Sequence, residues 1–176
     1  MLLQMTLLLF TAAAAVKDRE SSRISNILIG AAAVNGVFLQ FYGNGWSGLL
    51  KAAMGMSVPL VLCGWLFVLS MLGAGDVKLL MAVGIYTGPK EMLSVIVLAF
   101  ISGAVLSLAK LVKYGLIRER MYYLLNYVQR IMSGESGPYM DMTCPEKSEK
   151  WTIPFAVPVF MAVVILIAAN WGRVMG

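Results

Sequence analysis

The chain has 176 residues, of which 60% are hydrophobic and 13% are charged, and its formal net charge is +5. A soluble domain of this length needs more polar surface, so the composition favours an integral membrane protein, and the basic residues gather in short connections rather than in a nucleic-acid-binding patch. The chain has no histidine and only two cysteines, Cys63 and Cys144. These counts exclude Ser-His-Asp triads, Cys-His dyads and histidine metal sites, and they disfavour structural zinc.

Long apolar segments recur along the chain. A bilayer core of roughly 30 Å requires about 20 apolar residues in each helix, and the segments lack the alternation of barrel strands. The sequence therefore predicts an all-α polytopic membrane protein with about six transmembrane helices. The expected segments are residues 1–16, 24–42, 52–72, 77–88, which is short, 92–112 and 153–172.

The charges of the connections predict their sides of the membrane. Basic residues are frequent in 17–23, just after 73–76 and in the long connection 113–150. The connections 43–51 and 87–91 carry one lysine each. Because cytoplasmic connections are enriched in lysine and arginine, we expect the first group to be cytoplasmic and both termini to be external. This orientation predicts a multi-pass protein of the cytoplasmic membrane.

The connection 113–150 has internal patterning. Apolar residues at helical spacing alternate with arginines between residues 114 and 132. This pattern is typical of an amphipathic helix on the membrane surface, and a solvated linker is the alternative. We expect the whole chain, 1–176, to form a single membrane-embedded domain into which this connection is inserted between the fifth and sixth helices.

Two of the three aspartates lie at the borders of apolar segments. Asp141 is in the polar connection, whereas Asp18 and Asp76 adjoin the first and fourth predicted helices. The orientation derived from lysines and arginines places both at the cytoplasmic face. Ionisable residues at membrane depth are costly and favour a functional interpretation.

A pair of carboxylates is sufficient for hydrolysis. Two carboxylates in a site of low dielectric constant share one proton, because both cannot ionise easily. The ionised carboxylate deprotonates a water molecule while the protonated one polarises a peptide carbonyl. This chemistry needs neither histidine nor cysteine, and it requires no metal and no cofactor. We therefore expect Asp18 and Asp76 to be the catalytic pair.

Asp76 follows two glycines. Gly73 and Gly75 allow backbone conformations closed to other residues and allow a substrate backbone to approach closely. The alternative interpretation is an ordinary turn in which Asp76 caps the fourth helix.

These motifs resemble those of the type IV prepilin peptidases, which are membrane aspartyl proteases. Residues 73–80, Gly-Ala-Gly-Asp-Val-Lys-Leu-Leu, are similar to the GxGD signature of that family. In the family, the first aspartate precedes a basic residue followed by Ile-Pro-Asn. Here Asp18 precedes Arg23, Ile24 and Asn26, with Ser25 where proline is usual. The start of the last helix, Ile-Pro-Phe-Ala-Val-Pro at 153–158, is also similar.

The resemblance implies a substrate and a subclass. The expected partner is a prepilin with a hydrophobic N-terminal helix, whose basic leader is cut after a glycine at the cytoplasmic border. The paired CxxC motifs of longer members, which are associated with methyltransferase activity, are missing from this sequence. The chain is therefore similar to the short peptidases of tight-adherence, or Flp-type, pilus systems.

Four further residues have two interpretations each. Lys78 and Arg23 either anchor lipid phosphates or stabilise the carboxylates. Asn26 either forms a hydrogen bond near Asp18 or caps the second helix, and Pro154 either kinks the last helix or starts it.

Two other functions remain open from the sequence. An intramembrane GxGD protease resembling presenilin would have both aspartates deep in helices. A non-enzymatic transporter component or assembly factor would use the carboxylates to bind ions or a partner.

Overall fold

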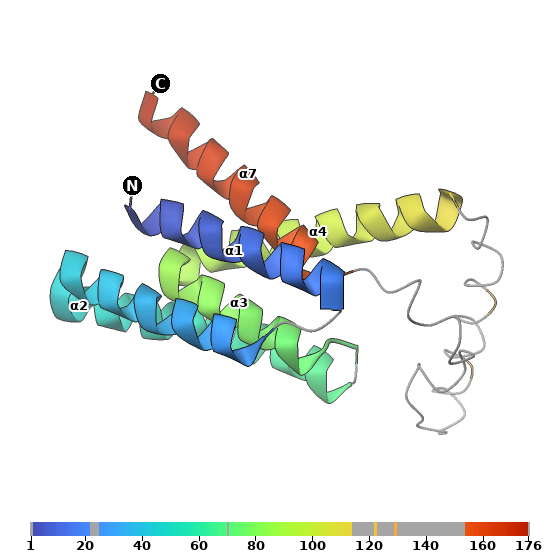
Figure 1. Cartoon of the computed structure of the whole chain (residues 1–176), viewed down its shortest axis with the longest axis horizontal. Coiled ribbons are helices and arrows are strands. Elements are labelled where there is room, and N and C mark those ends of the chain that lie inside the picture. Colours follow the sequence, from blue (N-terminus) through green and yellow to red (C-terminus); the bar gives the residue numbers. More distant parts are fainter. Residues whose placement is uncertain are drawn as a thin grey trace.

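The computed structural model describes residues 2–21, 25–69, 71–113, 122, 129 and 154–175. Every regular element in these ranges is a helix, as the sequence predicts. The elements are α1 (Leu2–Ser21), α2 (Asn26–Val68), α3 (Ala74–Thr87), α4 (Pro89–Lys113) and α7 (Ala156–Met175). They form a bundle in which segments distant in the sequence lie side by side (Figure 1). The amphipathic helix predicted for 114–132 lies almost entirely outside the described residues.

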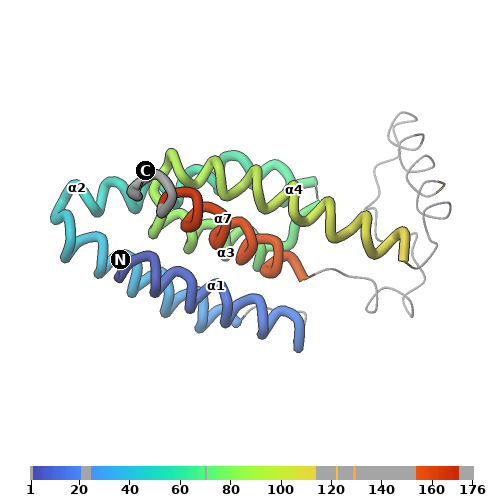
Figure 2. The backbone as a smooth tube through the Cα atoms, turned by 90° about the horizontal axis from the view of Figure 1, so that it is seen from above, coloured from blue at the N-terminus to red at the C-terminus, as the bar shows by residue number. Residues whose placement is uncertain are grey.

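Helix α2 consists of two arms that fold back on each other. The backbone leaves helical geometry at Gly45, where φ is 57° and ψ is −139°, a conformation that favours glycine. Figure 2 shows the chain reversing direction at this point. The two arms correspond to the second and third predicted segments, so each of the six predicted segments is mainly helical in the described residues. The predicted connection 43–51 is wrong in length, because only Gly45 departs from helical geometry.

The helix ends gather at two opposite ends of the bundle. One end holds the C-terminal ends of α1 and α4 and the start of α3 and α7 (Figure 1). The other end holds the start of α1, the end of α7, the reversal of α2 and the α3–α4 connection. The helix ends that flank the more basic connections therefore lie together at one end of the bundle, as the charge pattern predicts. The assignment of one end to the cytoplasm stays a prediction.

The outer faces of the helices carry large apolar side chains, such as Phe38, Trp65 and Val105, which are more than half exposed. Helices α2 and α4 are long and apolar enough to cross a membrane, and α7 contains a shorter apolar stretch, Ala156–Asn170. These features indicate a membrane protein. That six segments cross the bilayer stays a prediction.

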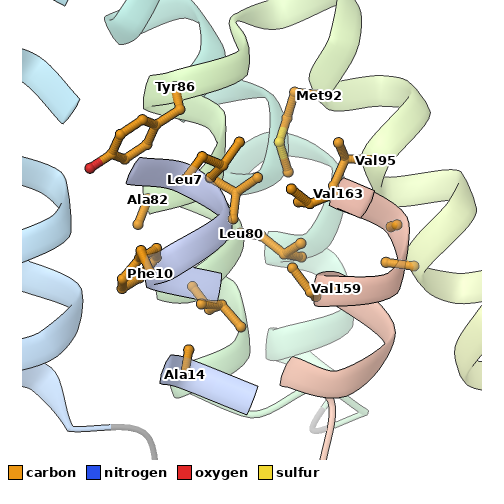
Figure 3. Packing of buried hydrophobic residues seen from close by; sticks show 14 of the residues in the cluster. Leu7, Phe10, Ala14, Leu80, Ala82, Tyr86, Met92, Val95, Val159 and Val163 are labelled. Atoms are coloured by element: carbon orange, nitrogen blue, oxygen red, sulfur yellow. The ribbon is translucent and has the colours of Figure 1, made fainter. Parts of the chain in front are cut away.

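Helix α3 is the most enclosed helix of the described chain. From Leu79 to Thr87, every residue except Met81 is buried. In Figure 3, Leu80 lies between Leu7 of α1 and Val159 of α7. Helix α3 therefore packs mainly against α2 and also contacts α1 and α7.

The far end of α3 is held by polar contacts. The buried amide of Gln40 donates hydrogen bonds to the carbonyl oxygens of Ile85 and Tyr86, at 3.1 and 3.2 Å. The hydroxyl of Tyr86 donates to the carbonyl oxygen of Ala32 at 2.7 Å. Carbonyl groups in the last turn of a helix lack partners within it, so Gln40 satisfies groups that would otherwise be buried unpaired. These bonds fix the axial position of α3 and thus of its first turn.

Candidate active site

Asp18 ends the buried stripe of α1. Residues recurring every three or four positions share one face of a helix, and the buried residues of α1 follow this spacing. They are Leu7, Phe10, Thr11, Ala14 and Ala15. Asp18 continues the same spacing and is only 6% exposed. Asp18 therefore lies on the apolar face of α1, near the C-terminal end of the helix, and its carboxylate faces the interior of the bundle.

The start of α7 holds one oxygen of Asp18. The backbone N–H of Ala156 donates a 3.1 Å hydrogen bond to Oδ2 of Asp18. Ala156 is the first residue of α7, and an N–H at this position has no acceptor within its own helix. The N-terminus of a helix also favours negative charge. This contact therefore offsets part of the cost of burying the carboxylate.

Asp76 lies in the first turn of α3. The helix begins at Ala74, with Gly73 as its N-cap. The predicted start at residue 77 is therefore three residues too late, and Asp76 lies inside the helix rather than before it. Asp76 stands one turn before Leu80, which packs between α1 and α7. Residues one turn apart share a helical face, so Asp76 is on the face of α3 that meets these two helices.

The environment of Asp76 disfavours its charged form. Asp76 lies in the first turn of α3, at the end of the helix, and its pKa is raised from 3.8 to about 6, with burial as the largest cause. Repulsion from the Asp18 carboxylate also raises this pKa, whereas a hydrogen bond from the Gly73 backbone lowers it. The repulsion shows that the two carboxylates lie near each other. The structure thus brings together the two aspartates paired from the sequence; their catalytic role stays a prediction.

The glycines before Asp76 do not adopt the special backbone conformation that the sequence predicts, because neither has a positive φ. Gly73 has φ of −72° and ψ of 148°, an extended conformation open to other residues. A Cβ atom at position 73 would stand 3.2 Å from Oδ2 of Asp76, whereas one at Gly75 would meet no atom within 4 Å. Gly73 therefore gives the Asp76 carboxylate room, and Gly75 leaves the surface beside it open.

Two of the predicted supporting residues contact each other. The Lys78 ammonium donates a 3.3 Å hydrogen bond to Oδ1 of Asn26, and both residues are exposed. This contact links the start of α2 to the first turns of α3. Arg23 lies outside the described residues. Any role of Lys78 in binding lipid, or of Asn26 beside Asp18, stays a prediction.

Pro154 starts α7 and does not kink it. It lies two residues before the helix, and its carbonyl oxygen accepts a 3.3 Å hydrogen bond from the N–H of Val157. Pro158 follows in the first turn, where a missing N–H is tolerated because it has no acceptor within the helix. The two prolines therefore set the position at which α7 begins, close to Asp18.

Ala156 contacts Asp18 but is not a residue that the sequence predicts at the site. Its contribution is a backbone N–H, which every residue except proline possesses, so no residue type marks it. The Pro-Phe-Ala-Val-Pro run indicates a helix start but not the partner of that start. In the described part of the chain, no three Cys, Asp or Glu side chains gather as a metal ion would require.

The sequence was also compared with known proteins. The sequence model of the type IV leader peptidase family matches residues 5–108. That range includes all of α2 and α3 and most of α1 and α4, and it contains both Asp18 and Asp76. No curated protein and no solved structure matches the chain.

Proposed function

The chain belongs to the type IV leader peptidase family, and on this premise we propose that it is an aspartic endopeptidase that removes the leader of Flp-like type IV prepilins. Asp18 and Asp76 are the catalytic pair, and the protein acts at the cytoplasmic face of the membrane. The observation that supports this proposal most strongly is the unequal environment of the two neighbouring carboxylates.

The two aspartates differ in what surrounds them. Asp18 is nearly enclosed and receives an N–H from the start of a helix, which stabilises a carboxylate anion. Asp76 is partly buried near Asp18, and its pKa, raised to about 6, favours the protonated form more than in an exposed aspartate. Pairs of titratable groups with unequal environments divide the roles of acid and base between them. We assign the base to Asp18 and the acid to Asp76.

Peptide hydrolysis then needs only water as a second reactant. Asp18 takes a proton from the water molecule as its oxygen attacks the carbonyl carbon of the scissile bond. Asp76 gives its proton to the carbonyl oxygen, which forms a neutral diol. The diol collapses when the C–N bond breaks and the leaving nitrogen receives the proton held by Asp18. Asp76 recovers a proton from the diol hydroxyl, so the pair returns to its starting state.

The open surface at Gly75 supports the choice of an extended peptide as substrate. An approaching backbone needs space without side chains, and Gly75 provides it one residue before Asp76. The hydrophobic N-terminal helix of a prepilin would lie in the same bilayer as the exposed apolar faces of the bundle. The leader junction would then reach the carboxylates from the side of the membrane.

The charge distribution supports the cytoplasmic face. At the end of the bundle that holds the aspartates, the described residues include Lys17, Arg19, Lys78, Lys110 and Lys113. The opposite end carries Lys51, Lys90 and Arg173. Such an excess of basic residues is typical of cytoplasmic segments.

The test is cleavage by the purified protein in lipid nanodiscs. An Flp-type prepilin is the substrate, and mass spectrometry identifies the product. We expect cleavage after the leader glycine, and Asp18→Asn and Asp76→Asn should each lower kcat by about 100-fold or more. Asp141→Asn, which changes the remaining aspartate, is the matched control and should retain activity. An intact prepilin, or full activity in either of the first two variants, would overturn the proposal.

A further inference from the structure

The start of α7 is fixed by contacts to two helices. On one side, the N–H of Ala156 binds Asp18 of α1. On the other side, the ring of Phe155 lies 5.8 Å from the ring of Phe100 in α4, centroid to centroid. The hydroxyl of Ser102, also in α4, lies 3.2 Å from the Pro158 carbonyl oxygen and is placed to donate a hydrogen bond to it. The amide that binds Asp18 is therefore held by a packed framework.

This amide lies in a part of the chain distant from both aspartates. The family match covers residues 5–108 and includes Asp18 and Asp76, whereas α7 begins at Ala156. Ala156 is itself 1% exposed, so the hydrogen bond is enclosed. Hydrogen bonds from a backbone N–H to a carboxylate are charge-assisted and stronger than those between neutral groups.

We propose that the backbone amide of Ala156 is the positioning group of Asp18, so that the start of α7 sets the orientation of the carboxylate that takes the proton from water. This inference rests on the proposed peptidase function. Binding of Oδ2 stops rotation of the carboxylate and leaves Oδ1 for the water molecule. A reacting group displaced by about 1 Å can lose about 100-fold in rate.

A positioning role differs from a purely structural one in its kinetic effect. A structural defect lowers the amount of folded protein and leaves kcat per folded molecule unchanged. Loss of positioning lowers kcat of the folded protein and leaves KM unchanged, because Ala156 is enclosed and need not touch the substrate. The two roles are therefore separable by kinetics on folded protein.

The first experiment compares Ala156→Pro with Ala156→Gly in nanodiscs, with the prepilin as substrate. Proline removes the N–H and is tolerated at the first position of a helix, whereas glycine keeps the N–H and alters only the side chain. We expect Ala156→Pro to lower kcat about 10- to 100-fold with KM within about twofold of the wild-type value. Ala156→Gly should keep kcat within about threefold of the wild-type value. This control measures how much a change of side chain alone at this enclosed position affects the rate.

If Ala156→Pro fails to fold, a backbone ester at position 156 serves as a second variant that lacks the N–H. The ester replaces the N–H by oxygen and changes the shape of the chain very little. Its effect on thermal unfolding is also measured in an Asp18→Ala background, which needs no activity. We expect the ester to lower the Tm of the otherwise wild-type chain more than that of the Asp18→Ala chain.

The outcomes separate this inference from the proposed function. A wild-type chain that cleaves the prepilin, together with an ester variant of unchanged kcat, overturns the inference alone. A wild-type chain that does not cleave overturns the proposed function, and the inference with it. A lower kcat at constant KM in the ester variant, with kcat retained in Ala156→Gly, supports the positioning role.

Discussion

Gly55 of α2 and Gly84 of α3 meet backbone to backbone, and each presents its α-carbon to the carbonyl oxygen of the other. A Cβ atom added to either glycine would clash with that oxygen. Such approaches permit weak Cα–H···O contacts and are common between membrane helices with small residues at the interface. The contact sets the distance between the second arm of α2 and the central helix that carries Asp76.

Substitution of either glycine by alanine should destabilise the bundle. The clash is with backbone atoms, so the helices must separate, and overpacking of this kind costs about 1–3 kcal/mol. We expect Gly55→Ala and Gly84→Ala to lower the Tm in detergent. Gly64→Ala, on the same arm of α2 as Gly55, is the control, because a Cβ atom there meets no atom within 4 Å. Equal stability of Gly55→Ala and Gly64→Ala would contradict the close contact.

The raised pKa of Asp76 predicts a pH-dependent effect of Asp76→Asn on stability. Below pH 3.8 the carboxyl is protonated in both the folded and the unfolded chain, so wild type and variant differ little in this respect. Between pH 3.8 and about 6 the unfolded chain ionises while the folded chain stays protonated, so the wild-type protein loses stability as pH rises. Above pH 6 this deficit is constant. The Asp76→Asn variant does not show this loss of stability, because asparagine does not ionise.

The measurement is the Tm of both proteins from pH 4 to pH 8. We expect the Tm advantage of Asp76→Asn to grow between pH 4 and about 6.5 and then to level off. Glu20→Gln is the control, because Glu20 is exposed at the same end of α1 as Asp18. A Tm difference independent of pH would show that Asp76 ionises as readily in the folded chain as in the unfolded one.

The two glycines before Asp76 should affect different kinetic constants. Alanine fits the backbone conformation of Gly73, but its Cβ would crowd Oδ2 of Asp76 at 3.2 Å. We expect Gly73→Ala to lower kcat about tenfold through displacement of the carboxylate, with an unchanged Tm. Gly75→Ala crowds no atom of the chain, so its expected effect is a higher KM from obstruction of the substrate. Steady-state kinetics of both variants with the prepilin test this prediction. It is wrong if both substitutions change kcat alone or both change KM alone.

The proposed orientation predicts which lysine positions a membrane-impermeant thiol reagent reaches from outside the cell. In a background with Cys63→Ala and Cys144→Ser, the exposed positions Lys90 and Lys113 are changed singly to cysteine. We expect Lys90→Cys to be labelled in intact cells and Lys113→Cys only after the membrane is opened. The reverse pattern would place the aspartates at the outer face.

The sequence predicts the helices and the acidic pair for a clear physical reason. Apolar runs are local properties, so the helical segments and the position of Asp18 at the border of the first of them follow from short stretches of sequence. The charge pattern likewise predicts that Asp18 and Asp76 share one end of the bundle. Both are features that composition and periodicity encode directly.

The remaining features depend on contacts that local sequence does not encode. The length of the connection at Gly45 depends on how closely the two arms of α2 pack. The function of Gly73 depends on where the Asp76 side chain turns. The hydrogen bond from Ala156 to Asp18 depends on a backbone group, and the position of that group is set by packing between α7 and α4.

The bond between Asp18 and Ala156 has a consequence for biosynthesis. The two residues are 138 positions apart in the chain, so a ribosome makes Asp18 long before it makes its partner. Asp18 and Asp76 are both synthesised while the last helix is still unmade. The nascent chain therefore cannot complete this carboxylate's surroundings until α7 has been translated and packed, so the acidic pair reaches its final environment well after both aspartates are made.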